Sequence, residues 1–112
     1  MNITIIGGGY VGLVTGACLS TLNHNVTIVE VFPEKVEAIN NAVPPIYEEG
    51  LADILKAHVG KNLTASTTYE SVQTADAIFI AVGTPPNADG SANLTYIRQA
   101  AENIADINFL NV

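Results

Sequence analysis

An isoleucine-rich segment that runs directly into a glycine-rich turn constrains the fold of this chain more than any other feature. Residues 1–6 (MNITII) have the apolar character of a strand that is buried in a parallel sheet. The turn that follows has the pattern G-x-G-x-x-G, with its glycines at Gly7, Gly9 and Gly12. A stretch with helical periodicity begins at once and extends over 10–22. This order predicts a strand, a tight turn and a helix that packs against the sheet.

Each glycine of the pattern has a separate physical role. Gly7 permits a tight turn, Gly9 lets the backbone approach a pyrophosphate, and Gly12 lets the helix pack close to the sheet. The start of the helix then directs free N–H groups and its positive dipole end at the phosphates. A second strand ends on Glu30, 18 residues after Gly12, and a carboxylate that binds an adenosine ribose is expected about 20 residues on. These features predict a dinucleotide site; the alternative is a glycine turn that serves the fold alone.

The rest of the chain alternates between short apolar strands and helical stretches. We expect strands over 26–31, 63–67 and 77–82, helices over 33–41, 48–59 and 94–104, and one or two helical turns over 70–74. This alternation, joined by right-handed crossovers, predicts an α/β fold with a doubly wound parallel sheet of the Rossmann type. The segment AIFIAV at 77–82 is expected to be the most deeply buried strand.

Helical spacing also predicts which side chains of two helices face the core. On the first helix these are Val11, Val14, Cys18 and Leu22. On the last helix they are Leu94, Ile97, Ala101 and Ile104.

The sequence stops where a six-stranded dinucleotide fold would still need two strands. Residues 107–112 begin another strand at most, so we expect a sheet that is truncated after about four strands and belongs to a longer protein. Such a sheet has an exposed edge at its fourth strand, which favours association.

Charge and composition exclude several classes of function. Four basic and 11 acidic residues give a formal net charge of −7 with no basic patch, which argues against nucleic acid or an anionic membrane as partner. No apolar run reaches the roughly 18 residues of a membrane span and no signal peptide is recognisable, so we expect a cytoplasmic protein. Cys18 is expected to be a small buried apolar residue, and the isolated His24 and His58 are expected to have no metal or catalytic role.

Three segments together go beyond a generic nucleotide fold. They are GGGYVGLVTGACLS at 7–20, PPIYEEGL at 44–51 and FIAVGTPPNADGSANL at 79–94. In this order and spacing they resemble the N-terminal NAD-binding domain of the UDP-glucose/GDP-mannose 6-dehydrogenase family, over about residues 1–105. The resemblance implies that 1–112 is a partial NAD-binding domain, without the central helical domain and the C-terminal substrate domain.

The resemblance also implies a reaction for the full-length parent. Such enzymes oxidise the C6 alcohol of a nucleotide sugar to a carboxylate and use NAD twice. Their catalytic cysteine, lysine, aspartate and asparagine lie later in the chain, so we expect no catalytic residue and no turnover here. UDP-glucose is the expected sugar, with GDP-mannose and N-acetylated UDP-hexoses open, and the parent is expected to be a homo-oligomer.

Matching the motifs residue by residue implies a set of cofactor-binding positions. They are Gly7, Gly9, Tyr10, Val11, Gly12, Glu30, Lys35, Val82, Gly83 and Thr84. Backbone N–H groups of Tyr10 and Val11 are expected to meet the pyrophosphate. Glu30 stands where the family usually has an aspartate on the adenosine ribose, and its charge should repel a 2′-phosphate and favour NAD over NADP. Lys35 approaches the same ribose or lies on a solvated helix face, and Thr84 contacts the cofactor or caps its loop.

Two departures from the family pattern affect the expected cofactor site, and three alternative functions stay open beside the main one. Gly8 stands where the family often has a larger residue, and the tail INFLNV lacks the family's next strand motif. One alternative is another Rossmann dehydrogenase, and a second is a non-catalytic module that binds or senses a dinucleotide. A third is an FAD-binding module, in which the ribose acid is a glutamate like Glu30.

Overall fold

Four parallel strands form the centre of the molecule, and they lie in the order β3-β2-β1-β4. The structure is a computed structural model that describes residues 1–107. In chain order its elements are β1 (Asn2–Ile6), α1 (Tyr10–Thr21), β2 (Asn25–Val29), α2 (Pro33–Asn40), α3 (Leu51–His58), β3 (Leu63–Ser66), the 3₁₀ helix η1 (Glu70–Thr74), β4 (Ala77–Ile80) and α4 (Thr95–Ala105). The predicted α/β fold with a doubly wound parallel sheet is therefore confirmed.

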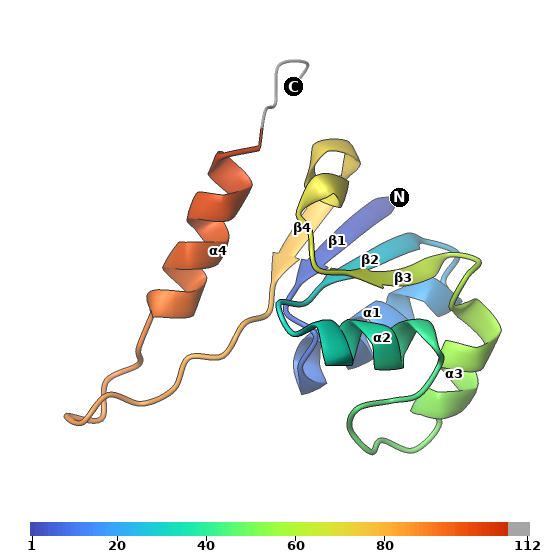
Figure 1. Ribbon diagram of the computed structural model, residues 1–112, viewed down its shortest axis with the longest axis horizontal. Coiled ribbons are helices and arrows are strands. Elements are labelled where there is room, and N and C mark those ends of the chain that lie inside the picture. Colours follow the sequence, from blue (N-terminus) through green and yellow to red (C-terminus); the bar gives the residue numbers. More distant parts are fainter. Residues whose placement is uncertain (108–112) are drawn as a thin grey trace.

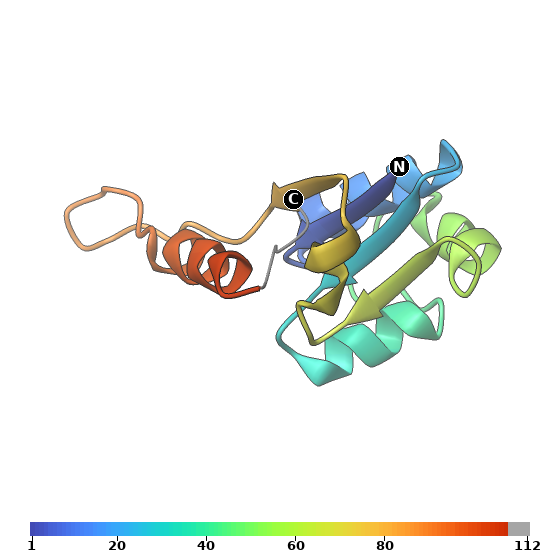
Figure 2. The same cartoon turned by 90° about the horizontal axis from the view of Figure 1, so that it is seen from above.

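Side chains of β1 alternate between two separate apolar clusters, one on each face of the sheet. Ile5 points into the larger cluster, where Leu13 of α1 and Leu55 of α3 are also fully buried. Ile6 points into the smaller cluster, which includes Ala100 of α4 and residues of β2 and η1. Figure 1 shows α1, α2 and α3 grouped at the sheet, while α4 lies beyond β4, and Figure 2 shows α4 on the same side from above. Helices cover both faces, as a doubly wound sheet requires.

Regular register brings the carboxyl ends of three strands together. Ile5 of β1 pairs with Ile28 of β2 on one side and with Phe79 of β4 on the other. Because all pairs are parallel, the turns that follow β1, β2 and β4 meet at one edge of the sheet. This edge is where ligands bind in open parallel sheets.

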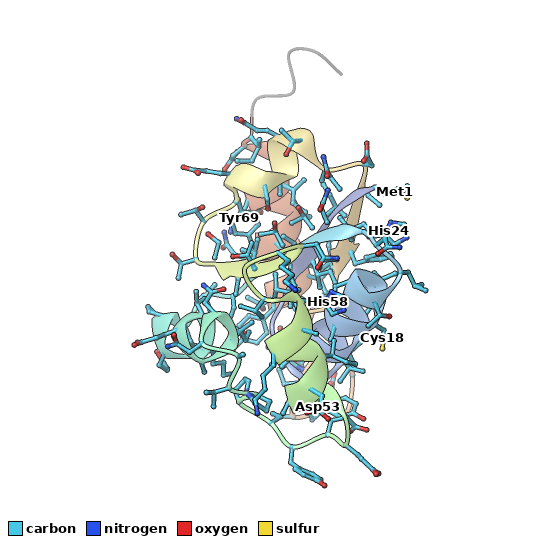
Figure 3. All side chains as sticks on the ribbon, turned by 90° about the vertical axis from the view of Figure 1, so that its right-hand side faces the viewer. Met1, Cys18, His24, Asp53, His58 and Tyr69 are labelled. Atoms are coloured by element: carbon cyan, nitrogen blue, oxygen red, sulfur yellow. The ribbon has the colours of Figure 1, made fainter. Side chains whose placement is uncertain are left out.

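The predicted buried face of α1 is wrong. Val11 and Leu22 are 64% and 65% exposed, and Cys18 is also exposed, as Figure 3 shows on the outer side of this helix. The face toward the sheet consists of small residues and one leucine, namely Gly12, Leu13, Gly16, Ala17 and Ser20. Apolar residues occur on nearly every side of α1, so their spacing does not select a face. The small residues decide the packing, because they let the helix lie closest to the strands.

The expected deep burial of the fourth strand is also wrong. β4 is shorter than 77–82, and Phe79 and Ile80 are 44% and 42% exposed because β4 pairs with β1 alone among the described strands. The expected exposed edge at the fourth strand is thus confirmed. On α4 the buried alanine is Ala100 rather than Ala101, and α3 begins at Leu51, after the left-handed Gly50, rather than at residue 48. The further strand expected over 107–112 lies, apart from its first residue, outside the described part of the chain.

One side chain joins α2 to the opposite, β3 edge of the sheet. The Asn40 amide nitrogen donates to the carbonyl oxygen of Ala65 at 2.9 Å, and the Ala65 N–H donates to the Asn40 amide oxygen at 2.8 Å. Asn40 thus satisfies two backbone groups of an edge strand, which would otherwise be available to pair with another strand.

Candidate functional site

A groove of about 370 Å³ lies at the carboxyl ends of β1, β2 and β4. One wall consists of the glycine turn and the residues that follow β2, and the opposite wall comes from α4. Six of the ten predicted cofactor-binding residues line the groove, namely Gly7, Gly9, Glu30, Lys35, Val82 and Gly83.

The three motif glycines have different surroundings. Gly7 has a φ of +112°, and a Cβ there would lie 2.6 Å from the carbonyl oxygen of Ala81. A Cβ at Gly12 would fall on the carbonyl oxygen of Gly7 and lie 3.0 Å from its carbonyl carbon. A Cβ at Gly9, by contrast, would have no described atom within 4 Å. Gly7 and Gly12 therefore allow backbone to pack on backbone, whereas Gly9 borders open space.

Gly9 is also the N-cap residue of α1, and among the described residues no side chain caps this helix end. The first N–H groups of a helix have no partner inside the helix, and they carry its positive dipole end. Open space beside them leaves room for an anionic group, such as a pyrophosphate. This arrangement suits the role that the sequence predicts for the turn.

Glu30 directly follows β2, and both of its carboxylate oxygens accept hydrogen bonds. The side chain is only 7% exposed. Its Oε1 accepts a hydrogen bond from the N–H of Gly8 at 3.2 Å, and its Oε2 accepts one from the N–H of Phe32 at 3.0 Å. A carboxylate offers about four acceptor positions, so about two remain for hydroxyl donors on a ligand in the groove. The two backbone bonds fix the direction in which those positions point.

Lys35 lines the same groove as Glu30, and its ammonium group lies over an aromatic ring. Its ammonium group is 5.1 Å from the centre of the Phe32 ring, within the range of a cation–π contact. Lys35 is half-buried and lines the groove, so it is not on a freely solvated face. An ammonium group at this place can donate hydrogen bonds to ribose or phosphate oxygens.

The other four predicted residues do not line the groove. Gly12 is buried on the side of α1 that faces the sheet, and Thr84 is exposed in the connection between β4 and α4. Tyr10 and Val11 form the first turn of α1 with their side chains exposed, so only their backbone groups face the helix end. The Tyr10 hydroxyl donates to Oε2 of Glu48 at 2.7 Å, and this hydrogen bond and the charge of Glu48 raise the pKa of the phenol.

Several groove residues were not predicted from the sequence. They are Ile6, Val29, Val31, Phe32, Tyr69, Ala81, Tyr96, Gln99, Ala100 and Asn103. Phe32 had a usable signal, because it closely follows the strand that ends on the ribose acid. The residues of α4 had none, since only the tertiary fold brings that helix to the groove.

Three further reactive side chains, those of Cys18, His24 and His58, lie outside the groove. Figure 3 labels them at separate places: Cys18 is exposed, whereas His24 and His58 are partly buried. His58 bonds to Asn62 at 2.9 Å, and within residues 1–107 no group of three His, Cys, Asp or Glu residues could hold a metal ion. The described helices are also all too short or too polar to cross a membrane.

Comparison with known proteins agrees with this geometry. Residues 1–109 match the model of the NAD-binding domain of the UDP-glucose/GDP-mannose dehydrogenase family. The chain belongs to this family. Its resemblance to the family and its assignment to NAD as cofactor are thereby confirmed.

Relatives within the family share both sequence and structure with the chain. The UDP-glucose 6-dehydrogenase YwqF of Bacillus subtilis is 46% identical over 107 residues, which are 94% of this chain and 24% of that protein. The GDP-mannose dehydrogenase of Pseudomonas aeruginosa superimposes with a TM-score of 0.90 at 38% identity, over 93% of this chain and 24% of that one. The UDP-glucose dehydrogenase of Pyrobaculum islandicum superimposes with a TM-score of 0.86 at 40% identity, over 92% of this chain and 24% of that one. The chain thus spans about a quarter of the length of these relatives.

The residues of the groove fit NAD. The uncapped start of α1 beside Gly9 suits the pyrophosphate, and the buried carboxylate of Glu30 has acceptor positions left for ribose hydroxyls. When bound, NAD supplies a hydride acceptor. The site residues predicted from the sequence stay predictions, since only binding measurements on variants test them.

Proposed function

We propose that this chain is the N-terminal NAD-binding domain of an enzyme that oxidises the C6 alcohol of UDP-glucose to a carboxylate. Family membership supports the reaction class, and a relative at 46% identity that is named a UDP-glucose 6-dehydrogenase supports the sugar. In this proposal, residues 1–112 form the N-terminal domain. A central helical domain and a C-terminal substrate domain belong to the rest of a homo-oligomeric parent.

The proposed overall reaction removes four electrons from the sugar in two steps. The alcohol is oxidised to an aldehyde and then, with the oxygen of water, to a carboxylate, while each step reduces one NAD⁺ to NADH. The part of this chain is to bind and orient the cofactor. The groups that contact the sugar and carry out the chemistry are assigned to the rest of the parent, so the chain alone is expected to be inactive.

The buried carboxylate of Glu30 is the observation that carries the cofactor proposal. It lies at the groove, its direction is fixed by two backbone N–H groups, and it retains acceptor positions for the two hydroxyls of an adenosine ribose. A 2′-phosphate in the same place would face this negative charge, and like charges at short distance repel. We therefore expect NAD to bind more tightly than NADP.

Calorimetric titration of the purified chain with NAD and, separately, with NADP tests the proposal. Saturable binding of NAD with clearly weaker binding of NADP is the expected result. Equal affinity for the two would contradict the ribose role of Glu30, and binding of neither would contradict a cofactor site in this chain.

An absorbance assay for NADH, with NAD and UDP-glucose added to the chain, tests the assignment of the chemistry to the rest of the parent. We expect no NADH from the chain alone. Turnover would show that residues 1–112 already contain the catalytic groups.

A further inference from the structure

Gly8 is the one residue of the GGG turn that the glycine motif does not require, yet it is closely surrounded. A Cβ at this position would lie 3.1 Å from Cβ, 3.2 Å from Cγ and 3.3 Å from Oε1 of Glu30. These distances are tighter than ordinary van der Waals contact. Unlike Gly7, Gly8 has a φ outside the left-handed region, so its backbone conformation is open to any residue. The space occupied by Glu30, rather than the backbone, accounts for a glycine here.

Glu30 has little freedom to move away from an added methyl group at position 8. Its own N–H donates to the carbonyl oxygen of Ser66 on β3 at 2.9 Å, which holds its backbone in line with the sheet. Its carboxylate is held at one oxygen by the N–H of Gly8 and at the other by the N–H of Phe32. All three atoms that a Cβ would approach belong to this one side chain. The nearest of these atoms is Cβ of Glu30, which side-chain rotation does not move, so Glu30 and the turn must shift apart by a few tenths of an ångström. Such a shift strains the 3.2 Å hydrogen bond from the N–H of Gly8 that aims the carboxylate.

We propose that Gly8 is a positioning residue for the ribose-binding carboxylate, and that its missing side chain helps to set the preference of this domain for NAD over NADP. The proposal rests on the NAD-binding function argued above. The N–H of Gly8 aims Glu30, and the absence of a Cβ leaves the room in which Glu30 is aimed. A side chain at position 8 displaces the carboxylate from the position in which it meets the ribose hydroxyls, although Gly8 itself does not line the groove.

The first test is Gly8→Ala in the 112-residue chain, titrated with NAD and with NADP. We expect the Kd for NAD to rise about tenfold and the Kd for NADP to change much less, because NADP gains nothing from the carboxylate. The ratio of the two Kd values therefore narrows. Gly9→Ala is the matched control: it adds the same methyl group one residue on, where no described atom lies within 4 Å. Because Gly9 borders the pyrophosphate that both dinucleotides share, we expect it to weaken NAD and NADP by the same factor.

A double-mutant cycle on stability supplies a second test that needs no ligand. Gly8→Ala is made in the natural chain and in a Glu30→Ala chain, and all four proteins are unfolded in urea. We expect Gly8→Ala to destabilise the natural chain more than the Glu30→Ala chain, because the truncated side chain keeps the contact with Cβ but loses the contacts with Cγ and Oε1.

The outcomes separate the two proposals. If the natural chain binds neither dinucleotide, its NAD-binding function is refuted and the positioning role falls with it. If the natural chain binds NAD but Gly8→Ala weakens NAD and NADP equally, the positioning role alone is refuted. Equal destabilisation by Gly8→Ala in both backgrounds also refutes it, because the methyl group would then act on the turn and not through Glu30.

Discussion

Replacing Gly12 by alanine is the sharpest test of how the glycine turn holds α1 on the sheet. The new Cβ falls on the carbonyl oxygen of Gly7, 3.0 Å from the carbonyl carbon and 3.3 Å from Cγ2 of Ile5. The first two of these atoms are backbone, so no side-chain rotation relieves the overlap. The start of α1 and the end of β1 must therefore move apart, although both belong to the densely packed interior.

Two opposing contributions set the change in the free energy of unfolding of Gly12→Ala. Alanine in place of glycine inside a helix favours the helix by about 1 kcal/mol. Overpacking of a core costs about 1–3 kcal/mol and more where nothing can give way, which is the case at Gly12. We expect a net loss of about 2 kcal/mol in the free energy of unfolding, and a fall in Tm of roughly 8 °C at the size of this chain.

Gly16→Ala, one turn further along the same helix, is the matched control. A Cβ there would lie 3.1 Å from Cδ1 of Ile28 and 3.1 Å from Cδ1 of Ile5, which are the flexible ends of side chains. The overpacking cost and the gain in helix propensity should nearly cancel. Urea unfolding followed by far-ultraviolet circular dichroism measures both variants. If Gly12→Ala is as stable as Gly16→Ala, the backbone contact at Gly7 does not limit the packing of α1.

Three further predictions concern single side chains. Glu30→Gln should raise the Kd for NAD about tenfold, because a charged acceptor of hydroxyl hydrogen bonds is lost; an unchanged Kd by calorimetry would exclude a ribose contact. Asn40→Ala should lower the free energy of unfolding, measured in urea, by about 1–2 kcal/mol, since two backbone groups of Ala65 lose their partner. Asn40→Asp keeps only the acceptor, so its free energy of unfolding should lie between those of the natural chain and Asn40→Ala. Glu48 raises the folded-state pKa of Tyr10, so the stability that the Tyr10–Glu48 hydrogen bond contributes is present below the unfolded-state pKa of Tyr10 and is lost as pH rises through the folded-state pKa. Glu48→Gln should therefore lower the Tyr10 pKa in an absorbance titration of tyrosinate. An unchanged titration would show that the pair does not form in solution.

The order of the elements could be predicted from the sequence because local signals agree with the fold. Isoleucine-rich strands, a glycine turn and helical spacing recur in an alternation that only a parallel sheet with crossovers satisfies. The faces of α1 could not be predicted, since its exposed Val11 and Leu22 are as apolar as its buried Leu13. A local sequence pattern could not predict the exposure of Phe79 either, because this exposure depends on which strands lie beside β4.

The sequence predicts the chemical groups of the candidate site but not the contacts that hold those groups in place. The sequence indicates the ribose acid at Glu30 from its distance to the glycines. It does not indicate that the N–H of Gly8 holds one of the oxygens, because that bond joins a turn after β1 to a side chain after β2. The second bond, from the N–H of Phe32, is local and depends on how the chain bends after β2. The wall that α4 contributes, including Tyr96, lies still further from any local signal.

The glycine motif of this chain therefore meets two different requirements, close packing of the backbone and free space for a ligand. Gly7 and Gly12 have backbone atoms where a side chain would be, so any substitution acts first on the fold. Gly9 has open space there, so a substitution acts first on the ligand. Gly8 lies outside the motif, and the three atoms nearest to an added Cβ all belong to the ribose acid, so a substitution acts on the position of that acid. Substitutions at these four positions should therefore change different measured quantities. At Gly7 and Gly12 they should lower stability, and at Gly9 they should lower the affinity for both dinucleotides. At Gly8 they should change the ratio of the Kd values for NAD and NADP.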